Sequence, residues 1–318
     1  MKSYCFGIDV GGTTIKMGLF ETDGTLVEKW EIPTRTENHG EKIIADIAEA
    51  VLGKMSEKNI NKDEVVGVGI GTPGPIDESG VIHKAANLGW GTFNLEETLY
   101  KLLMIPVKAG NDANVAALGE MWQGGGKGFR NVVLVTLGTG VGGGIIVNGK
   151  ILTGSTGAGG EIGHIHINDD ETQICGCGNK GCLEQYTSAT GIVTLANRIL
   201  SKTDEPSVLR DVEISAKSVF DAVKEGDQVA IQVAEEFGRY LGRGLAGVAG
   251  VCNPEIFVIG GGVSKAGTIL FDYIVKNYRA YVFHGSADAK FALATLGNRA
   301  GIYGAAKLIL NEVDGSRN

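Results

Sequence analysis

Residues 4–32 read YCFGIDVGGTTIKMGLFETDGTLVEKWEI, and this stretch decides the expected fold. An apolar run ends at a Gly-Gly-Thr-Thr turn, and a second run leads to an Asp-Gly pair, which is typical of a two-residue hairpin turn. A third run follows that turn. The pattern predicts three consecutive strands over residues 4–9, 15–20 and 26–32.

The same pattern returns in residues 132–152, VVLVTLGTGVGGGIIVNGKIL. Here the turns are Gly-Thr-Gly at 138–140 and Asn-Gly at 148–149. Two hairpins can resemble each other by chance. However, both copies carry a Gly/Thr cluster after the first strand, so we interpret them as an internal repeat at the scale of a domain.

The remaining apolar patterns predict an α/β protein. Further strands are expected at 65–70, 107–109 and 256–259, and helices at 43–52, from Asp112 to about 121, from about Lys265, and at about 300–311. With 318 residues, the chain is long enough for two domains. We predict a smaller N-terminal domain from residues 1–115 plus 300–318 and a larger one from 116–299.

Composition and charge exclude several classes of protein. The formal net charge is −8, which disfavours a nucleic-acid partner because phosphate neutralisation needs a basic face. No apolar stretch reaches the ~18 residues of a membrane span, and the short first strand, which carries Asp9, does not fit a signal peptide. We therefore expect a cytoplasmic protein with neither a nucleic-acid nor a membrane partner.

Glycine is unusually abundant. The chain has 50 glycines, roughly twice the usual ~7%, and they gather in tight clusters between apolar runs. Three clusters follow strands, at 11–12, 138–140 and 260–262. Glycine permits the close backbone approach that a phosphate cradle requires, and nearby Thr hydroxyls and Lys16 would add donors. Plain hairpin turns would explain one such loop but not all three.

The known nucleotide motifs do not account for these loops. There is no G-x-x-x-x-G-K-[S/T] sequence, because Lys127 is followed by Gly128. Residues 138–143 do match G-x-G-x-x-G, but a strand and an Asn-Gly turn follow them instead of the helix that a dinucleotide site needs. We therefore reject the dinucleotide interpretation.

Three of the five cysteines, Cys175, Cys177 and Cys182, lie within eight residues, and His164 and His166 precede them. Three cysteines and one histidine form a closed tetrahedral zinc site of the structural kind. The spacing does not choose between the two histidines, because residues two apart share one strand face. A disulfide with one free thiol is the alternative.

Several polar residues could bind a substrate. Asp112 and its neighbour Asn111 follow a strand and open a helix. On this evidence alone a helix cap is the commoner role, and a general base is the functional alternative. Glu161 and Glu184 flank the cysteine cluster and could accept hydrogen bonds from a polyol, or could simply be solvated. Asn87 is a further candidate for hydroxyl binding.

Paired glycine-rich hairpins resemble the actin–hexokinase–heat-shock-protein ATPase fold, a two-domain, ribonuclease-H-like architecture with its active site in the interdomain cleft. The resemblance implies that each half supplies one phosphate hairpin. It also implies that Asp9, at the end of the first strand, orients a magnesium ion through water. Capping of the turn is the alternative role for Asp9.

Seven motifs together give a narrower resemblance. The chain resembles the ROK (repressor, open reading frame, kinase) family of sugar kinases over essentially its whole length, and bacterial glucokinases most. The motifs are GIDVGGTTIK at 7–16, GTPGP at 71–75, NLGW at 87–90, NDAN at 111–114, TLGTGVGGG at 136–144, GGEIGH at 159–164 and CGCGNKGCLE at 175–184.

The resemblance implies a role for each motif. Asp112 would be the base that deprotonates the sugar 6-hydroxyl. His164 would be the zinc ligand and would touch the sugar with its other ring nitrogen. Sugar-binding residues would be Gly74, Asn87, Asn111, Asp112, Glu161, His164 and Glu184. ATP would be bound by Asp9, Gly11, Gly12, Thr13, Thr14, Lys16, Gly138, Thr139, Gly140, Gly260, Gly261 and Gly262. Structural zinc would be bound by His164, Cys175, Cys177 and Cys182.

The implied function is ATP- and magnesium-dependent phosphorylation of a hexose at the 6-hydroxyl, with glucose as the expected substrate. A homodimer or a dimer of dimers is expected. Three alternatives remain. The first is a kinase for N-acetylmannosamine, fructose or mannose, and the second is a sugar-sensing regulator, which is disfavoured because the first strand begins at Tyr4. The third is a glycoside hydrolase that uses Asp112, Glu161 and Glu184, which would leave the glycine loops unexplained.

Overall fold

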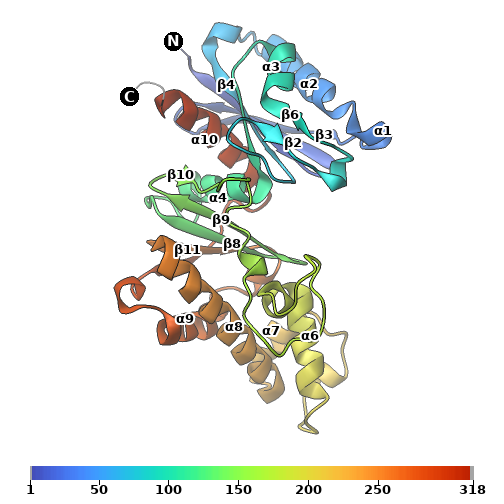
Figure 1. Cartoon of the computed structure of the whole chain (residues 1–318), viewed down its shortest axis with the longest axis vertical. Helices are drawn as coiled ribbons and strands as arrows, with labels where there is room; N and C mark the ends of the chain where they lie inside the picture. The colour runs from blue at the N-terminus through green and yellow to red at the C-terminus, as the bar shows by residue number, and fades with distance from the viewer. Residues whose placement is uncertain (1, 316–318) are drawn as a thin grey trace. The chain divides into compact units, whose positions relative to one another are not determined.

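The computed structural model describes residues 2–315, and Figure 1 shows its arrangement of strands and helices. The strands are β1 (Tyr4–Val10), β2 (Thr14–Glu21), β3 (Leu26–Pro33), β4 (Val65–Thr72), β5 (Val81–Ile82), β6 (Phe93–Asn94), β7 (Val107–Asn111), β8 (Val132–Leu137), β9 (Val141–Val147), β10 (Lys150–Ile151), β11 (Ile256–Gly260) and β12 (Lys290–Leu293).

The helices fall between and after these strands. They are α1 (Glu37–Gly40), α2 (Ile43–Glu57), α3 (Leu95–Leu103), α4 (Asp112–Gln123), α5 (Glu184–Thr187), α6 (Ala189–Leu200), α7 (Ala216–Lys224), α8 (Gln228–Cys252), α9 (Ile269–Tyr281) and α10 (Ala300–Gly315). Short 3-10 turns are η1 (Lys62–Glu64), η2 (Ala86–Leu88), η3 (Ile162–His164), η4 (Val208–Arg210), η5 (Val263–Ala266), η6 (His284–Ser286) and η7 (Gly297–Arg299).

Two five-stranded sheets share one topology. The first has the order β3-β2-β1-β4-β7, with antiparallel pairs among its first three strands and parallel pairs from β1 to β7. The second has the order β10-β9-β8-β11-β12, and its last three strands are likewise parallel. The internal repeat inferred from the two hairpin stretches is therefore confirmed.

Strand β1 alternates between two cores. Phe6, Ile8 and Val10 point into a cluster shared with α2 and α3, as the period of two in a strand requires. Cys5, in contrast, belongs to a second cluster that includes Ile302 of α10. Both faces of this part of the sheet are therefore covered, and the odd-numbered residues of β1 face α10.

Helix α10 packs unusually close to the first sheet, beside the strands of the N-terminal segment (Figure 1). A Cβ atom on Gly7 would overlap the carbonyl oxygen of Ile302, and one on Gly69 would overlap that of Ala305. These glycines permit the close approach of helix and strand. Part of the glycine excess thus serves packing and not phosphate binding, a role that the cluster argument did not anticipate.

By residue contacts, the described chain forms two compact units. The first runs to Gly128 and adds Gly144–Gly160 and the segment from Leu296 on, whereas the second contains Phe129–Gly143 and Glu161–Thr295. This division assigns the whole of α4 to the first unit, whereas the expected boundary after residue 115 falls within this helix. The boundaries of independently folding domains, 1–115 with 300–318 and 116–299, stay a prediction.

One expected helix begins later than the sequence suggested. Lys265 lies in the 3-10 turn η5, and α9 starts only at Ile269. The cause is Gly267, whose φ of 91° interrupts helical geometry between the two elements. Among the described residues, no helix combines the length and apolar character that crossing a membrane would require.

Candidate active site

The four side chains predicted to bind zinc converge in the second unit. Cys175, Cys177 and Cys182 lie in the loop that leads into α5, and His164 ends η3. Their ligand atoms all lie within 4.8 Å of one another. Cys175 Sγ is 3.7 Å from His164 Nδ1, and Cys177 Sγ is 3.6 Å from Cys182 Sγ. The four groups form a candidate metal site, which we call the knuckle.

The distances within the knuckle suit a tetrahedral zinc ion. With Zn–S bonds of about 2.3 Å, two sulfur ligands on a tetrahedron are about 3.8 Å apart. A disulfide would need sulfur atoms about 2.05 Å apart. All five cysteines are free, so the alternative of a disulfide with one free thiol is wrong.

The structure distinguishes the two histidines that the spacing left open. Both ring nitrogens of His166 face other partners: Nδ1 lies 2.9 Å from the Lys180 carbonyl oxygen, and Nε2 lies 2.8 Å from Asp169 Oδ1. These two contacts raise the pKa of His166, with the Asp169 contact the stronger cause. His164 Nδ1 instead faces the sulfur atoms, so His164 is the histidine of the knuckle.

Glu184 joins the knuckle to the glycine turn at 138–140. Its Oε2 accepts a hydrogen bond from the Val141 N–H at 2.9 Å, and its Oε1 lies 3.7 Å from Cys175 Sγ. A Cβ on Gly140 would overlap the same carboxylate. Within this unit, Glu184, which is predicted to bind sugar, therefore contacts both a predicted zinc ligand and a predicted phosphate-binding turn.

The second and third glycine loops lie next to each other. Both follow neighbouring parallel strands, since residues 256–260 of β11 pair with residues 132–136 of β8. Gly261 has a φ of 84° and packs directly against the backbone of Leu137, at the end of β8. The 138–140 and 260–262 loops therefore meet at one edge of the second sheet, where backbone groups can bind a phosphate together.

The first glycine loop is a tight turn between β1 and β2 in the first unit. The Gly11 N–H donates to the Thr14 carbonyl at 3.0 Å, and Thr34 Oγ1 donates to the Gly11 carbonyl at 2.7 Å. Gly12 and Thr13, at the tip of the turn, are exposed. The turn is thus fixed at its base and open at its tip.

Asp9 lies directly behind this turn. Its Oδ2 is 3.7 Å from Lys16 Nζ, and its carboxyl group packs against Gly301 of α10. Burial raises the pKa of Asp9, and the nearby Lys16 opposes that rise without cancelling it. Because Lys16 offsets the effect of burial on this carboxylate only in part, the group is well suited to bind a further cation.

Asn111 and Asp112 have different local roles. The Asn111 side chain caps α4 by accepting from the N–H groups of Ala113 at 3.0 Å and Asn114 at 3.3 Å. Asn111 Nδ2 also donates to the Gly74 carbonyl at 3.3 Å, which joins two residues predicted to bind sugar. Asp112, the first residue of α4, is exposed. The cap is therefore Asn111, and the exposed Asp112 carboxylate also accepts from the Ala113 N–H at 2.8 Å.

The other predicted sugar residues are exposed on short 3-10 turns. Asn87 lies in η2 and Glu161 directly precedes η3. Trp90 is buried, and its indole N–H donates to the Gly40 carbonyl at 3.2 Å, so it packs in the core. The first unit carries Gly74, Asn87, Asn111 and Asp112, and the second carries Glu161, His164 and Glu184.

Residues 5–312 match the sequence profile of the ROK family. The chain belongs to the ROK family. A glucokinase from Halalkalibacterium halodurans is 45% identical over 309 residues, which cover 95% of this chain and 94% of that protein. The family resemblance drawn from the seven motifs is thus confirmed.

Solved ROK structures are similar over nearly the whole chain. A ROK hexokinase from Thermus thermophilus is 31% identical with a TM-score of 0.81, and the match covers 98% of this chain and 99% of that one. A ROK family glucokinase from Streptomyces griseus, solved with glucose and AMPPNP, is 35% identical with a TM-score of 0.71, over 96% of this chain and 98% of that one. The actin/hexokinase-like fold class is therefore confirmed.

Sequence reasoning missed one prominent buried contact in the second unit. Glu171 is buried and pairs with Arg198, 27 residues further along the chain. Glu171 stands in the polar run Asn-Asp-Asp-Glu-Thr-Gln, which reads as a solvated loop. No periodic pattern connects it with an arginine at the end of α6, so a single sequence carries no signal for the pair.

Proposed function

We propose that this ROK protein is a glucokinase that transfers the γ-phosphoryl group of ATP to the 6-hydroxyl of glucose, with Asp112 as the general base. The observation that carries the proposal is the 45% identity, over 95% of the chain, to a glucokinase. The related Streptomyces griseus structure with glucose and AMPPNP supports the same pair of substrates. The products would be glucose 6-phosphate and ADP.

Asp112 is the best candidate base because of its position and its exposure. It opens α4 at the carboxyl end of β7, where α/β proteins bind their ligands. Its neighbour Asn111 supplies the helix cap, so the Asp112 carboxylate is not required for that purpose. In phosphoryl transfer, the protein mainly positions the reactants and accepts the hydroxyl proton, and an exposed carboxylate meets the second need.

ATP would be held by the three glycine loops. The adjoining 138–140 and 260–262 loops offer backbone N–H groups at one sheet edge, and the 11–14 turn offers an exposed tip. The half-buried Asp9 carboxylate would orient the magnesium ion that accompanies ATP, through water. Magnesium supplies charge neutralisation on the phosphates when bound.

Glucose hydroxyl groups would be bound by carboxylate and amide side chains. The residues proposed to bind the sugar are Gly74, Asn87, Asn111, Asp112, Glu161, His164 and Glu184. Carboxylate oxygens accept from sugar hydroxyls, and amide side chains both donate and accept. The contact of Glu184 with Val141 fixes one of its oxygens and so orients the carboxylate.

The knuckle would hold a structural zinc ion through His164, Cys175, Cys177 and Cys182. Four protein ligands leave no open coordination position, so the metal would shape the loop that carries Glu184 and would take no part in the reaction. Protein purified without added zinc should contain about one zinc ion per chain. A metal-free protein with full stability would count against this assignment.

Assembly and location complete the proposal. Three exposed apolar side chains, Val251, Tyr281 and Phe283, support the expected homodimer or dimer of dimers. They lie in two segments of the chain, which are joined by the hydrogen bond from Ser286 Oγ to Asn253 Oδ1. Sedimentation should give a mass well above the 33.3 kDa of one chain. Use of ATP and reduced thiols fits a cytoplasmic enzyme that supplies glucose 6-phosphate to glycolysis.

A sugar panel tests the substrate. ADP release should be measured with Mg-ATP and glucose, mannose, fructose, N-acetylglucosamine or N-acetylmannosamine. The proposal predicts the highest kcat/KM for glucose. A preference for an N-acetylated sugar would keep the mechanism and overturn the substrate, and no turnover of any sugar would overturn the kinase proposal.

A further inference from the structure

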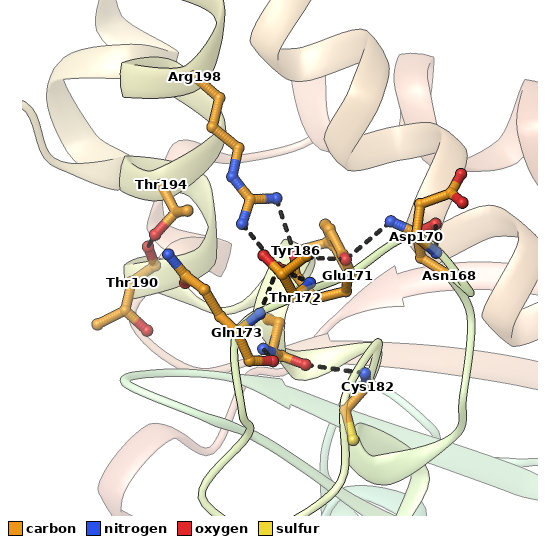
Figure 2. Close-up of polar contacts among 11 residues, drawn as sticks. Asn168, Asp170, Glu171, Thr172, Gln173, Cys182, Tyr186, Thr190, Thr194 and Arg198 are labelled. Carbon is orange, nitrogen blue, oxygen red and sulfur yellow. Dashed lines mark hydrogen bonds and ion pairs between the residues drawn. The ribbon is translucent and has the colours of Figure 1, made fainter.

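The Glu171 carboxylate accepts five hydrogen bonds, all from protein groups (Figure 2). Arg198 donates two of them in a bidentate pair, at 2.9 and 3.0 Å. The Tyr186 hydroxyl donates a third at 2.6 Å, and the N–H groups of Thr172 and Gln173 donate the others at 3.0 Å each. Both carboxylate oxygens are therefore saturated, and the group is unavailable to a ligand.

These bonds attach the segment 168–173 to the helices of the second unit. Arg198 comes from α6 and Tyr186 from α5, and the Tyr186 ring stacks on Tyr240 of α8 at 4.0 Å. Asn168 Nδ2 donates to the Tyr186 hydroxyl at 2.9 Å. The segment is thus fixed by groups from α5 and α6, and the α5 group is in turn packed against α8.

Gln185 continues the network into the knuckle. Its Oε1 accepts from the Cys182 N–H at 3.0 Å, and its Nε2 donates to the Gln173 carbonyl at 3.0 Å. Figure 2 shows the network around Glu171 above Cys182 and the knuckle loop. Glu184, the preceding residue of α5, is the carboxylate proposed to bind sugar. The Glu171 network therefore includes Tyr186, and Gln185 connects the segment at Gln173 to the knuckle at Cys182. Glu184 lies in the chain between these two anchored residues, Cys182 and Tyr186.

A metal ion would not restrain this segment by itself. Its ligands, His164 and Cys175, lie on either side of residues 165–174, and backbone hydrogen bonds attach residues 165–168 to residues 181–183. Residues 169–173, in the middle of the stretch, need another anchor. A buried ion pair is a costly anchor, because apolar residues of similar size often stabilise a fold as well or better. Its advantage is geometry, since a bidentate pair with three further donors permits a single arrangement of the segment.

We propose that Glu171 and Arg198 are positioning residues for the sugar site: they hold the knuckle segment, and through it the Glu184 carboxylate, in the geometry that binds the sugar. This inference rests on the proposed function. Neither residue touches substrate. Their loss should weaken sugar binding while the reacting groups and the ATP loops stay as they are.

The test compares Glu171→Gln and Arg198→Met with wild-type enzyme, all zinc-loaded. Replacing a supporting partner of this kind typically costs about 10–100-fold, so the KM for glucose should rise at least about tenfold. The kcat should stay within about threefold and the KM for ATP should not change, because the interaction lost is one made with bound sugar. Zinc content should remain about one per chain, which shows that each variant has folded.

Two further variants sharpen the test. Tyr186→Phe removes one of the five donors and keeps the ring stacking, so a smaller rise of glucose KM is expected. Lys276→Met is the matched control, because it breaks an exposed ion pair with Glu235 in the same unit. That control should match wild type in both KM values.

Each result decides the proposal. A wild-type glucose KM in folded Glu171→Gln and Arg198→Met would overturn it, as would a loss of kcat with both KM values unchanged, which indicates a general structural defect. If wild type phosphorylates glucose but these variants behave normally, only the positioning role is wrong. If wild type neither phosphorylates nor binds glucose, the proposed function and this inference are both wrong.

Discussion

Asp112 and Glu171 are both acidic residues, yet the surroundings of their carboxylates are opposite. Asp112 is exposed at the first position of α4, where the Ala113 N–H donates to it at 2.8 Å. Glu171 is buried and accepts five hydrogen bonds from Arg198, Tyr186 and two backbone N–H groups. The Asp112 carboxylate is exposed, whereas the Glu171 carboxylate is buried and fully hydrogen-bonded.

The difference separates chemistry from positioning. A general base must be able to reach a hydroxyl proton, so it cannot be surrounded by protein donors. A group that fixes a loop gains from every donor it accepts. We therefore expect changes at Asp112 to affect turnover with little effect on stability, and changes at Glu171 to affect sugar affinity and stability with little effect on turnover.

The largest effect is expected for Asp112→Asn. The amide cannot accept the 6-hydroxyl proton, and general-base catalysis contributes about 10²–10⁴-fold, so kcat should fall by that factor. Glucose affinity, measured by calorimetry, should stay within a few-fold of wild type. The free energy of unfolding should change by less than about 1 kcal/mol, because only a charge at a helix N-terminus is lost.

Asp272→Asn is the matched control for this variant. Asp272 is also an exposed aspartate in the first turn of a helix, α9. Its replacement should leave kcat unchanged. A near-normal kcat in Asp112→Asn, or an equal loss in both variants, would remove the basis for assigning Asp112 as the base.

Removal of the metal should have the next largest effect. Cys177→Ser, or treatment with a zinc chelator, takes away one ligand or the ion itself, and the loop carrying Glu184 then loses its cross-link. We expect zinc content to fall below one per chain and glucose turnover at low sugar concentration to drop at least about tenfold. Cys252→Ser, outside the knuckle, should retain both. Full activity without metal would contradict a shaping role for zinc.

The Glu171 pair should give a distinctive pH dependence of stability. Burial raises the pKa of Glu171, but hydrogen bonds from Arg198 and Tyr186 outweigh burial and lower it to about 2, from 4.5. Because the folded pKa is the lower one, the stabilisation is complete above about pH 4.5 and is lost as the pH falls towards 2.

Urea unfolding of wild type and Glu171→Gln across this range measures the effect. The difference in unfolding free energy should be constant, on the order of 2 kcal/mol, from pH 7 to 5 and should shrink below pH 4.5. Acid-induced metal loss affects both proteins and cancels in the difference. A difference that did not change with pH would mean that the carboxylate charge is not what stabilises the segment.

The smallest effect is expected at the cap beside Asp112. Asn111→Ala removes the side chain that accepts from Ala113 and Asn114, and loss of a helix cap costs about 1 kcal/mol. Asn111→Asp keeps the capping oxygen and should retain stability, while losing the amide that donates to Gly74. Thermal unfolding of the two variants checks this. Equal destabilisation would show that capping is not the role of Asn111 in stability.

Much of the fold could be predicted from the sequence, because local patterns encode it. Tight turns with Asp-Gly and Asn-Gly pairs, each after two apolar runs, are enough to predict the two hairpins and hence the repeat. The knuckle was also accessible, since three cysteines within eight residues leave few alternatives. The spacing of the residues could not decide between His164 and His166 as the zinc ligand, because residues two apart share a strand face. The structure was needed to distinguish them.

The rest depends on contacts between distant residues. Gly7 and Gly69 looked like part of a general glycine excess, but each is required by the carbonyl groups of α10, more than 230 residues away. The polar sequence around Glu171 suggests a solvated acid, but in the structure the side chain pairs with Arg198. Neither pairing leaves a periodic trace in one sequence, so only packing reveals it.

The most direct test of the central claim is identification of the product formed from glucose and Mg-ATP by the purified wild-type protein. Phosphorus NMR of the reaction mixture separates phosphate attached at each hydroxyl of the sugar, and the ADP formed can be measured in the same sample. We predict glucose 6-phosphate and ADP in equal amounts, with Asp112→Asn forming neither at a comparable rate. Phosphorylation at another hydroxyl, or ADP formed without a sugar phosphate, would contradict it.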